Sequence, residues 1–189
     1  MKTDPKFQHI SALETDTQTL RDRSIYILVT LFRKLGFTYE DFKKEGVLPN
    51  EFLMVFGVTS MDAGTRFGVN FALYTKSLLA LGTQKHEYLK KRAFECKDLG
   101  CFMLTEMGHG SNVQGILTTA NYIHSKRGFI VQTPVNIGMK FWIGNLAQTA
   151  NMAVLFAQLI VDGENEGVHC FVIRIRDDDV NVLPVMTIV

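Results

Sequence analysis

The residues best suited to chemistry lie in one glycine-rich stretch, residues 105–115, which reads Thr-Glu-Met-Gly-His-Gly-Ser-Asn-Val-Gln-Gly. Its three glycines expose backbone N–H groups and allow a flat or anionic ligand to approach the backbone closely. The hydroxyls of Thr105 and Ser111 add hydrogen-bond donors and acceptors. This composition is typical of a ligand-binding loop, and an ordinary turn between two strands is the alternative of equal weight.

The glycine spacing excludes two common ligand loops. Gly108, Gly110 and Gly115 form the pattern Gly-x-Gly-x4-Gly, which is neither the dinucleotide-binding fingerprint nor a P-loop. No Lys-Ser or Lys-Thr pair follows them. A Rossmann-type or NTPase reading is therefore disfavoured.

A second stretch, residues 140–145, reads Lys-Phe-Trp-Ile-Gly-Asn and contains the single tryptophan of the sequence. The glycine permits close approach, and the asparagine offers both a donor and an acceptor. A tryptophan at the end of a strand belongs to a core about twice as often as to a ligand platform. Taken together, however, the two stretches favour a flat aromatic ligand.

The first half of the chain has the periodicity of helices. The spacing predicts a helix that opens at Asp16 and stops at Gly36, a short one near residue 50, and a long one from about residue 60 to Leu81. Thr83 is expected to cap a further helix that reaches residue 94. The expected apolar positions of the short helix are Phe52, Leu53 and Phe56.

The second half has the pattern of short strands. A hairpin is expected from 116–124 and 129–133 around a four-residue turn. The other expected strands are 101–104, 139–143, 152–160 and 168–176, with a loop at 162–167 before the last. Helices followed by strands predict an α+β protein with an N-terminal α-helical domain, residues 1–97, and an antiparallel β-barrel-like domain, residues 98–189.

Composition excludes several classes of protein. Of the 189 residues 47% are apolar or aromatic, which is enough for a sizeable core, and the net charge of +1 gives no sign of a nucleic-acid surface. The three cysteines fit neither a disulfide scaffold nor a zinc ribbon. We expect no membrane insertion and no metal site, and the acidic run 177–179 is interpreted as a solvated loop.

Four stretches together resemble the acyl-CoA oxidases, FAD-dependent flavoenzymes of peroxisomal fatty-acid β-oxidation. They are residues 81–86, 100–115, 118–120 and 140–145. The related acyl-CoA dehydrogenases have Thr-Glu-Pro and then Gly-Ser in the loop, so Met107 and His109 favour the oxidase branch. The resemblance covers most of the chain after about residue 20.

The resemblance implies a helical N-terminal domain, a middle β domain and C-terminal helical domains, the last of which this sequence lacks. It implies FAD bound between the β domain and the C-terminal domains, with Thr105 and Gly144 contacting the flavin. Phe141 stands where the family usually has the first of two tryptophans, so an aromatic face is kept and an indole N–H is lost.

The implied reaction converts an acyl-CoA into a trans-2-enoyl-CoA and reduces O2 to H2O2. The implied base is a glutamate of the C-terminal domain, so no catalytic residue is assigned in residues 1–189. Glu106 is expected to be a structural carboxylate that accepts backbone N–H groups. The resemblance also implies a fatty acyl-CoA substrate, a homodimer and a peroxisomal location, although the sequence carries no import signal.

Other readings stay open on the sequence alone. The chain is an oxidoreductase at the level of the family, and the alternative is a catalytically inactive fragment or short isoform. Such a form would bind acyl-CoA or FAD weakly, or associate with a full-length subunit. For His109, contact with substrate or flavin and a purely loop-shaping role are both open.

Overall fold

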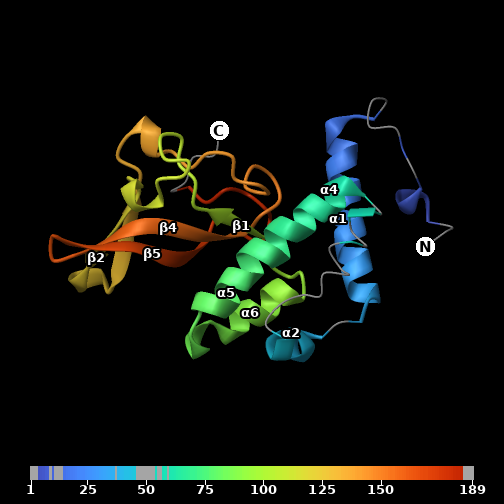
Figure 1. Cartoon of the computed structure of the whole chain (residues 1–189), viewed down its shortest axis with the longest axis horizontal. Helices are drawn as coiled ribbons and strands as arrows, with labels where there is room; N and C mark the ends of the chain where they lie inside the picture. The colour runs from blue at the N-terminus through green and yellow to red at the C-terminus, as the bar shows by residue number, and fades with distance from the viewer. Residues whose placement is uncertain are drawn as a thin grey trace. The chain divides into compact units, whose positions relative to one another are not determined.

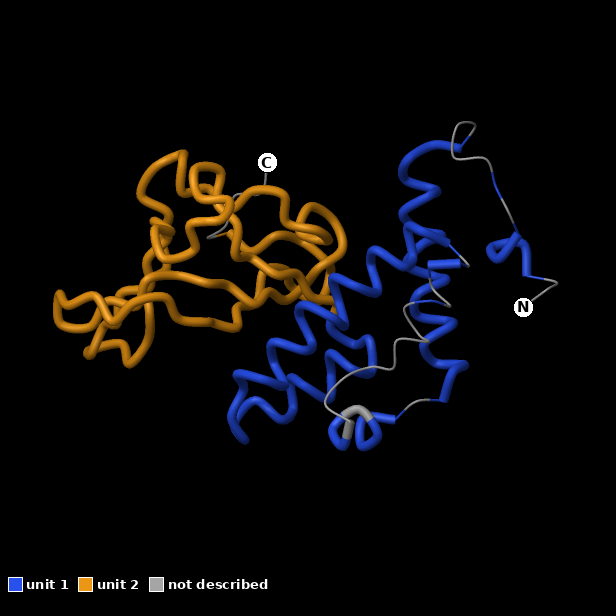
Figure 2. The backbone as a smooth tube through the Cα atoms, viewed as in Figure 1, with its two compact units in different colours: residues 1–98 blue, residues 99–189 orange. Residues whose placement is uncertain are grey.

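The computed structural model describes residues 4–8, 10, 15–36, 38–45, 54, 57–58 and 60–184. The chain divides into two compact units, Met1–Asp98 and Leu99–Val189 (Figure 2). Among the described residues, the α-helices lie in the first unit and the β-strands in the second. The predicted α+β class, with helices preceding strands, is confirmed.

Unit 1 opens with a short 3-10 turn at Pro5–Phe7 and then α1, Thr17–Lys34. The carboxylate of Asp16 caps α1 by accepting the Thr19 N–H at 2.9 Å, and Gly36 follows its end with a φ of +66°. The next helix, α2, spans Tyr39–Glu45. The predicted limits of α1 are confirmed.

A long helical run follows, built from α4, Met61–Phe67, a π-helical stretch η2, Gly68–Thr75, and α5, Lys76–Leu81. After a 3-10 turn at Gln84–His86, α6 spans Glu87–Phe94. Phe52, Leu53 and Phe56, which carry the helix predicted near residue 50, lie outside the described residues. No helix in the described part of the chain is both long and apolar enough to span a membrane.

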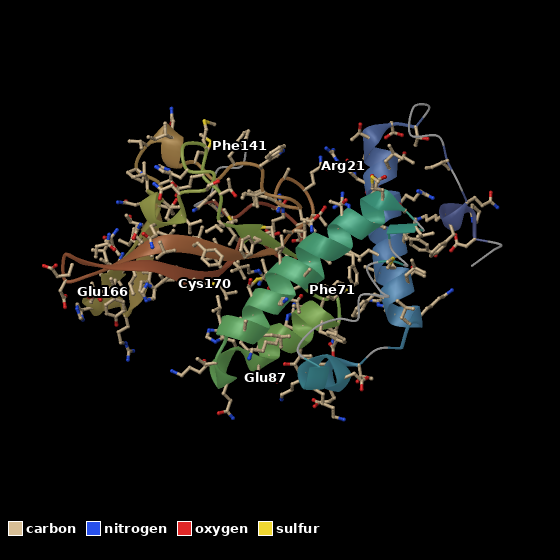
Figure 3. The ribbon with its side chains drawn as sticks, viewed as in Figure 1. Arg21, Phe71, Glu87, Phe141, Glu166 and Cys170 are labelled. Atoms are coloured by element: carbon tan, nitrogen blue, oxygen red, sulfur yellow. The ribbon has the colours of Figure 1, made fainter. Side chains whose placement is uncertain are left out.

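Aromatic rings form the core of unit 1. Phe32 of α1 stacks on Phe71 of η2 with ring centroids 4.2 Å apart, and Phe94 of α6 meets Phe32 edge-on at 5.1 Å. All three rings are buried, and Figure 3 labels Phe71 on the long helical run. Offset and edge-on pairs contribute roughly 0.5–1.5 kcal/mol beyond the burial of their area. They therefore join three helices that are distant in sequence.

Unit 2 is one five-stranded sheet (Figure 1). Its strands are β1, Gly100–Met103, β2, Thr119–Ile123, β3, Gly128–Gln132, β4, Met152–Val161, and β5, Glu164–Arg174. The predicted hairpin is confirmed as the antiparallel pair β2 and β3.

The sheet is open and mixed, whereas the sequence predicted an antiparallel, barrel-like domain. β5 pairs antiparallel along β4, while β1 pairs parallel with Met152–Leu155 and β2 pairs parallel with Gln158–Ile160 of the same strand. Because both of these stretches of β4 also pair with β5, β1 and β2 must share the opposite edge of β4. Strand patterning reports which residues are apolar but not the direction of the neighbouring strand, so the sequence did not reveal the parallel pairs.

Two local predictions were also wrong. Residues 139–143 form no strand, and only Lys140 makes a β-bridge, with Glu106. The loop expected at 162–167 is a tight turn, because Asp162 and Gly163 both adopt positive φ, +53° and +88°. An Asp-Gly pair suits this two-residue hairpin turn, and it lets β4 and β5 pair almost to their tips.

Candidate functional site

A gap in the sheet lies along β4, between the part that pairs with β1 and the part that pairs with β2. The side chain of Lys140 occupies it, because its ammonium donates to the carbonyl oxygens of Leu104 at 3.0 Å and Phe156 at 2.9 Å. Leu104 follows β1, and Phe156 lies between the two paired stretches of β4. At this point the two carbonyl oxygens accept hydrogen bonds from a lysine side chain and not from the backbone of a neighbouring strand.

Glu106 balances that charge. Its side chain is buried, and Oε1 accepts from Lys140 Nζ at 3.1 Å and from the Thr118 N–H and hydroxyl at 2.9 and 2.7 Å. Oε2 accepts the Leu117 N–H at 2.7 Å and lies 3.1 Å from His109 Nδ1. Both oxygens are therefore occupied by protein donors.

These contacts keep the Glu106 carboxylate ionised. Burial by itself raises the pKa of Glu106, but hydrogen bonds from Thr118 and Leu117 and the charge of Lys140 outweigh burial and lower its pKa from 4.5 to about 2. Burial lowers the pKa of Lys140, and the bond to Glu106 opposes that shift. A saturated carboxylate of low pKa is a poor base, so Glu106 is the structural carboxylate that the sequence predicts.

The ion pair joins the two stretches that the sequence singled out. One backbone hydrogen bond joins them directly, Phe141 N–H to Thr105 O at 3.0 Å. Two more come from residues just before the second stretch, Met107 N–H to Met139 O at 2.9 Å and Gly108 N–H to Ile137 O at 2.8 Å. The absence of a side chain at residue 138 matters here. A Cβ on Gly138 would lie 3.1 Å from Leu117 Cβ and 3.2 Å from Thr133 Cγ2.

Apolar side chains are exposed where the two stretches meet. Met107, Ile137 and Phe141 are each about half exposed, and Trp142 is 89% exposed. Figure 3 shows Phe141 among the loops that lie above the sheet in that view. The core position that the sequence left as the alternative for Trp142 does not hold, because its side chain is exposed. Contiguous exposed apolar groups of this kind mark a surface that binds a ligand or another protein surface.

The backbone under this surface is held in uncommon conformations. Trp142 and Asn145 have positive φ, +62° and +68°, a region that costs a residue other than glycine about 1–3 kcal/mol. Arg176, a buried side chain, donates to the carbonyls of Ala147 and Ala150 and so holds the turn that follows Gly144. Such strain persists only where the surrounding structure enforces it.

The predicted flavin contacts, Thr105 and Gly144, both lie beside this surface. Thr105 is half-buried, its carbonyl accepts from Phe141, and its hydroxyl makes no hydrogen bond within the described part of the chain. Gly144 is exposed and begins the turn that Arg176 holds. A free hydroxyl, an exposed glycine and an exposed indole fit a flat, polar-edged ligand such as a flavin.

The sequence did not reveal the buried residues that support the site. Lys140 appeared only as part of a motif, and Thr118 and Arg176 were not assigned roles. The available signal was that Lys140 is the single charged residue in the run Val-Asn-Ile-Gly-Met-Lys-Phe-Trp-Ile. A lone lysine in such a run is expected to have a buried partner.

An open groove of about 890 Å³ lies beside the ion pair. Met103, Leu155 and Ile173 line its floor, on adjacent strands of one face of the sheet. Its walls include β3 and the segment that follows it, and Thr118 and Lys140 border it. The sheet therefore presents an apolar hollow next to the two loops.

Known proteins that resemble this chain are acyl-CoA oxidases. Acyl-coenzyme A oxidase 3 of Yarrowia lipolytica is 34% identical over 180 residues, which are 94% of this chain and 25% of that protein. The peroxisomal acyl-coenzyme A oxidase 3 of Arabidopsis thaliana is 38% identical over 133 residues, 70% of this chain and 20% of that protein. No family model matches the chain.

The same relationship holds in three dimensions. The crystal structure of acyl-coA oxidase3 from Yarrowia lipolytica superposes with a TM-score of 0.81 and 30% identity, over 97% of this chain and 26% of that one. The fold is thus one found in acyl-CoA oxidases. The chain belongs to the acyl-CoA oxidase family, and it spans about a quarter or less of the length of the relatives named here.

Replacing Glu106 by glutamine tests the buried pair. We expect Glu106→Gln to lower the free energy of unfolding at pH 7 by about 3–5 kcal/mol, because Lys140 is left buried without its counter-charge. The pKa of about 2 also predicts stability that is fully present above pH 4.5 and is lost as the pH falls towards 2, about 3 kcal/mol in all. Urea unfolding at a series of pH values measures both.

The matched control is Glu166→Gln, at an exposed position near the tip of the β4–β5 hairpin (Figure 3). It should change stability by less than about 0.5 kcal/mol and keep the acid dependence. If the free energy of unfolding falls equally at acid pH in Glu106→Gln and in the wild type, the low pKa of Glu106 is contradicted.

Glycine at residue 142 should relieve the strained backbone. We expect Trp142→Gly to raise the free energy of unfolding by about 1 kcal/mol, because glycine adopts positive φ without strain and the exposed indole loses few contacts. Trp142→Ala retains a Cβ and should give no gain. Chemical denaturation followed by circular dichroism compares them, and a glycine variant less stable than the alanine variant would show that the residue is not strained.

Proposed function

We propose that this chain acts within an FAD-dependent acyl-CoA oxidase of peroxisomal fatty-acid β-oxidation. In that reaction a fatty acyl-CoA loses one hydrogen from each of its α and β carbons to give a trans-2-enoyl-CoA. The two electrons and two protons reduce O2 to H2O2. Bound FAD would supply the two-electron chemistry that links the acyl substrate to oxygen.

Two residues of this chain would contact the cofactor directly. The half-buried Thr105 would use its free hydroxyl, and the exposed Gly144 would allow the cofactor to approach the backbone. The exposed rings of Phe141 and Trp142 would cover apolar ring surface and exclude water. The Glu106–Lys140 pair would hold these groups in place without entering the chemistry.

The domain assignment belongs to the same proposal. Residues 1–97 would form the helical N-terminal domain and residues 98–189 the middle β domain of the enzyme. The active assembly would be a homodimer in the peroxisome, a location that names of similar proteins carry. The base that takes the α-proton would come from outside residues 1–189.

One observation supports this proposal most strongly. The single tryptophan is 89% exposed, has a φ of +62°, and follows a residue paired with the backbone of Thr105. An exposed aromatic group held at a conformational cost is expected where a ligand repays that cost.

Titration of the purified chain with FAD, followed by calorimetry and flavin fluorescence, tests the proposal. We expect saturable binding, weakened about threefold to tenfold in Thr105→Val, which loses one hydrogen bond and keeps its shape. The matched control is Thr65→Val, an exposed residue of α4 in unit 1, which should bind as the wild type does. A parallel titration with palmitoyl-CoA examines the substrate.

Two results would count against the proposed function. The first is the absence of FAD binding by the folded wild-type chain at micromolar concentrations. The second is equal weakening by Thr105→Val and Thr65→Val, which would place the flavin away from the loop.

A further inference from the structure

The imidazole of His109 lies against the Glu106 carboxylate. Its Nδ1 is 3.1 Å from Glu106 Oε2, and its side chain is 17% exposed. The backbone is fixed as well, because the His109 N–H donates to Glu106 O at 3.1 Å. Both the ring and the main chain of His109 are thereby tied to the buried ion pair.

The direction of this hydrogen bond follows from the state of the carboxylate. Glu106 is ionised, so its oxygens accept hydrogen bonds and do not donate them. Oε2 already accepts from the Leu117 N–H. Nδ1 must therefore carry a proton and donate it to Glu106. In the neutral ring the other nitrogen, Nε2, is then unprotonated and is an acceptor.

Nε2 has no hydrogen-bond partner in the part of the chain that the structure describes. His109 lies between two glycines, both exposed, and a Cβ added to Gly110 would meet nothing within 4 Å. Its neighbour Met107 belongs to the apolar surface that also includes Phe141 and Trp142. The ring is thus partly exposed, two residues from Met107, and its Nε2 is an acceptor that no described residue occupies.

We propose that Glu106 holds His109 in the Nδ1-protonated form, so that its Nε2 accepts a hydrogen bond from an N–H or O–H group of the ligand bound at this surface. The inference rests on the proposed function for the identity of that ligand. An anionic ligand group is a poor match, because the lone pair of Nε2 would repel it. His109 would be a specificity-determining residue, and Glu106 the positioning residue that sets its tautomer.

Such donors occur on both ligands of the proposed enzyme. FAD has a ring N–H and ribityl hydroxyls, and the CoA part of the substrate has amide N–H groups. The shared chemistry is a neutral hydrogen-bond donor, and separate titrations distinguish the two sources.

The tautomer is measured without any ligand. Long-range ¹H–¹⁵N correlation spectra of the full chain at pH 7.5, with His109 assigned from the spectrum of His109→Asn, report which ring nitrogen carries the proton. We expect Nδ1–H for His109. His124, whose exposed ring pairs through Nε2 with Asp162, provides the internal comparison and should show Nε2–H. An Nε2–H ring at His109 would overturn the inference.

Binding tests the role of Nε2. In His109→Asn the amide N–H2 takes the place of Nδ1 and donates to Glu106, while the Nε2 acceptor is lost. We expect this variant to retain the wild-type unfolding midpoint in urea and to bind FAD or palmitoyl-CoA about threefold to tenfold more weakly. The control His124→Asn should bind both ligands as the wild type does.

The outcomes separate this inference from the proposed function. Weaker binding of FAD alone, or of palmitoyl-CoA alone, supports the inference and identifies the donor. Unchanged affinity of His109→Asn for both ligands, with the wild type binding them, overturns the inference and leaves the proposed function intact. If the wild type bound neither ligand, the proposed function would fail together with the ligand role of His109, whereas the tautomer would still be decided by the spectra.

Discussion

The buried ion pair between Glu106 and Lys140 is the interaction on which the rest of unit 2 depends. Two charges out of water are costly, and they are stable here only because each makes several further hydrogen bonds. Lys140 satisfies carbonyls at the end of β1 and in the middle of β4, while Glu106 accepts the N–H groups that lead into β2. One pair thus closes the gap between two strands that share an edge of β4.

A buried scaffold and an exposed surface follow from this arrangement. The ion pair is buried, and it fixes two loops whose outer sides carry Met107, Phe141 and Trp142 in the open. Trp142 and Asn145, with their positive φ values, lie between Phe141, whose N–H bonds to Thr105, and the turn that Arg176 holds. A binding surface needs such support, because loops supply the contacts while rigid elements supply the accuracy.

Much of the fold could be predicted from the sequence, because local patterns carry it. Asp16 and Gly36 mark the ends of α1, and the four-residue turn 125–128 between two strand-like stretches predicts the β2–β3 hairpin. The direction of β1 and β2 relative to β4 could not be read, since side-chain alternation is the same in parallel and antiparallel pairs. The expected strand at 139–143 failed because the Lys140 side chain, and not the backbone around it, pairs with β4.

The sequence predicted the two motifs of the candidate site but not the buried contacts that support them. The two stretches that contain Thr105 and Gly144 were identified from composition and resemblance, and the structure brings their segments together through the backbone pairing of Thr105 with Phe141. The roles of Lys140, Thr118 and Arg176 depend on contacts between residues 12 to 36 positions apart. Contacts of that range leave no periodic signal in the sequence.

A double-mutant cycle on Glu106→Gln and Lys140→Met, measured as free energies of unfolding in urea at pH 7, tests the central claim most directly. If the two side chains act as one buried unit, the double variant should lose at least about 2 kcal/mol less than the sum of the single losses, because neither charge is then left buried alone. Losses that add to within about 0.5 kcal/mol would contradict the account.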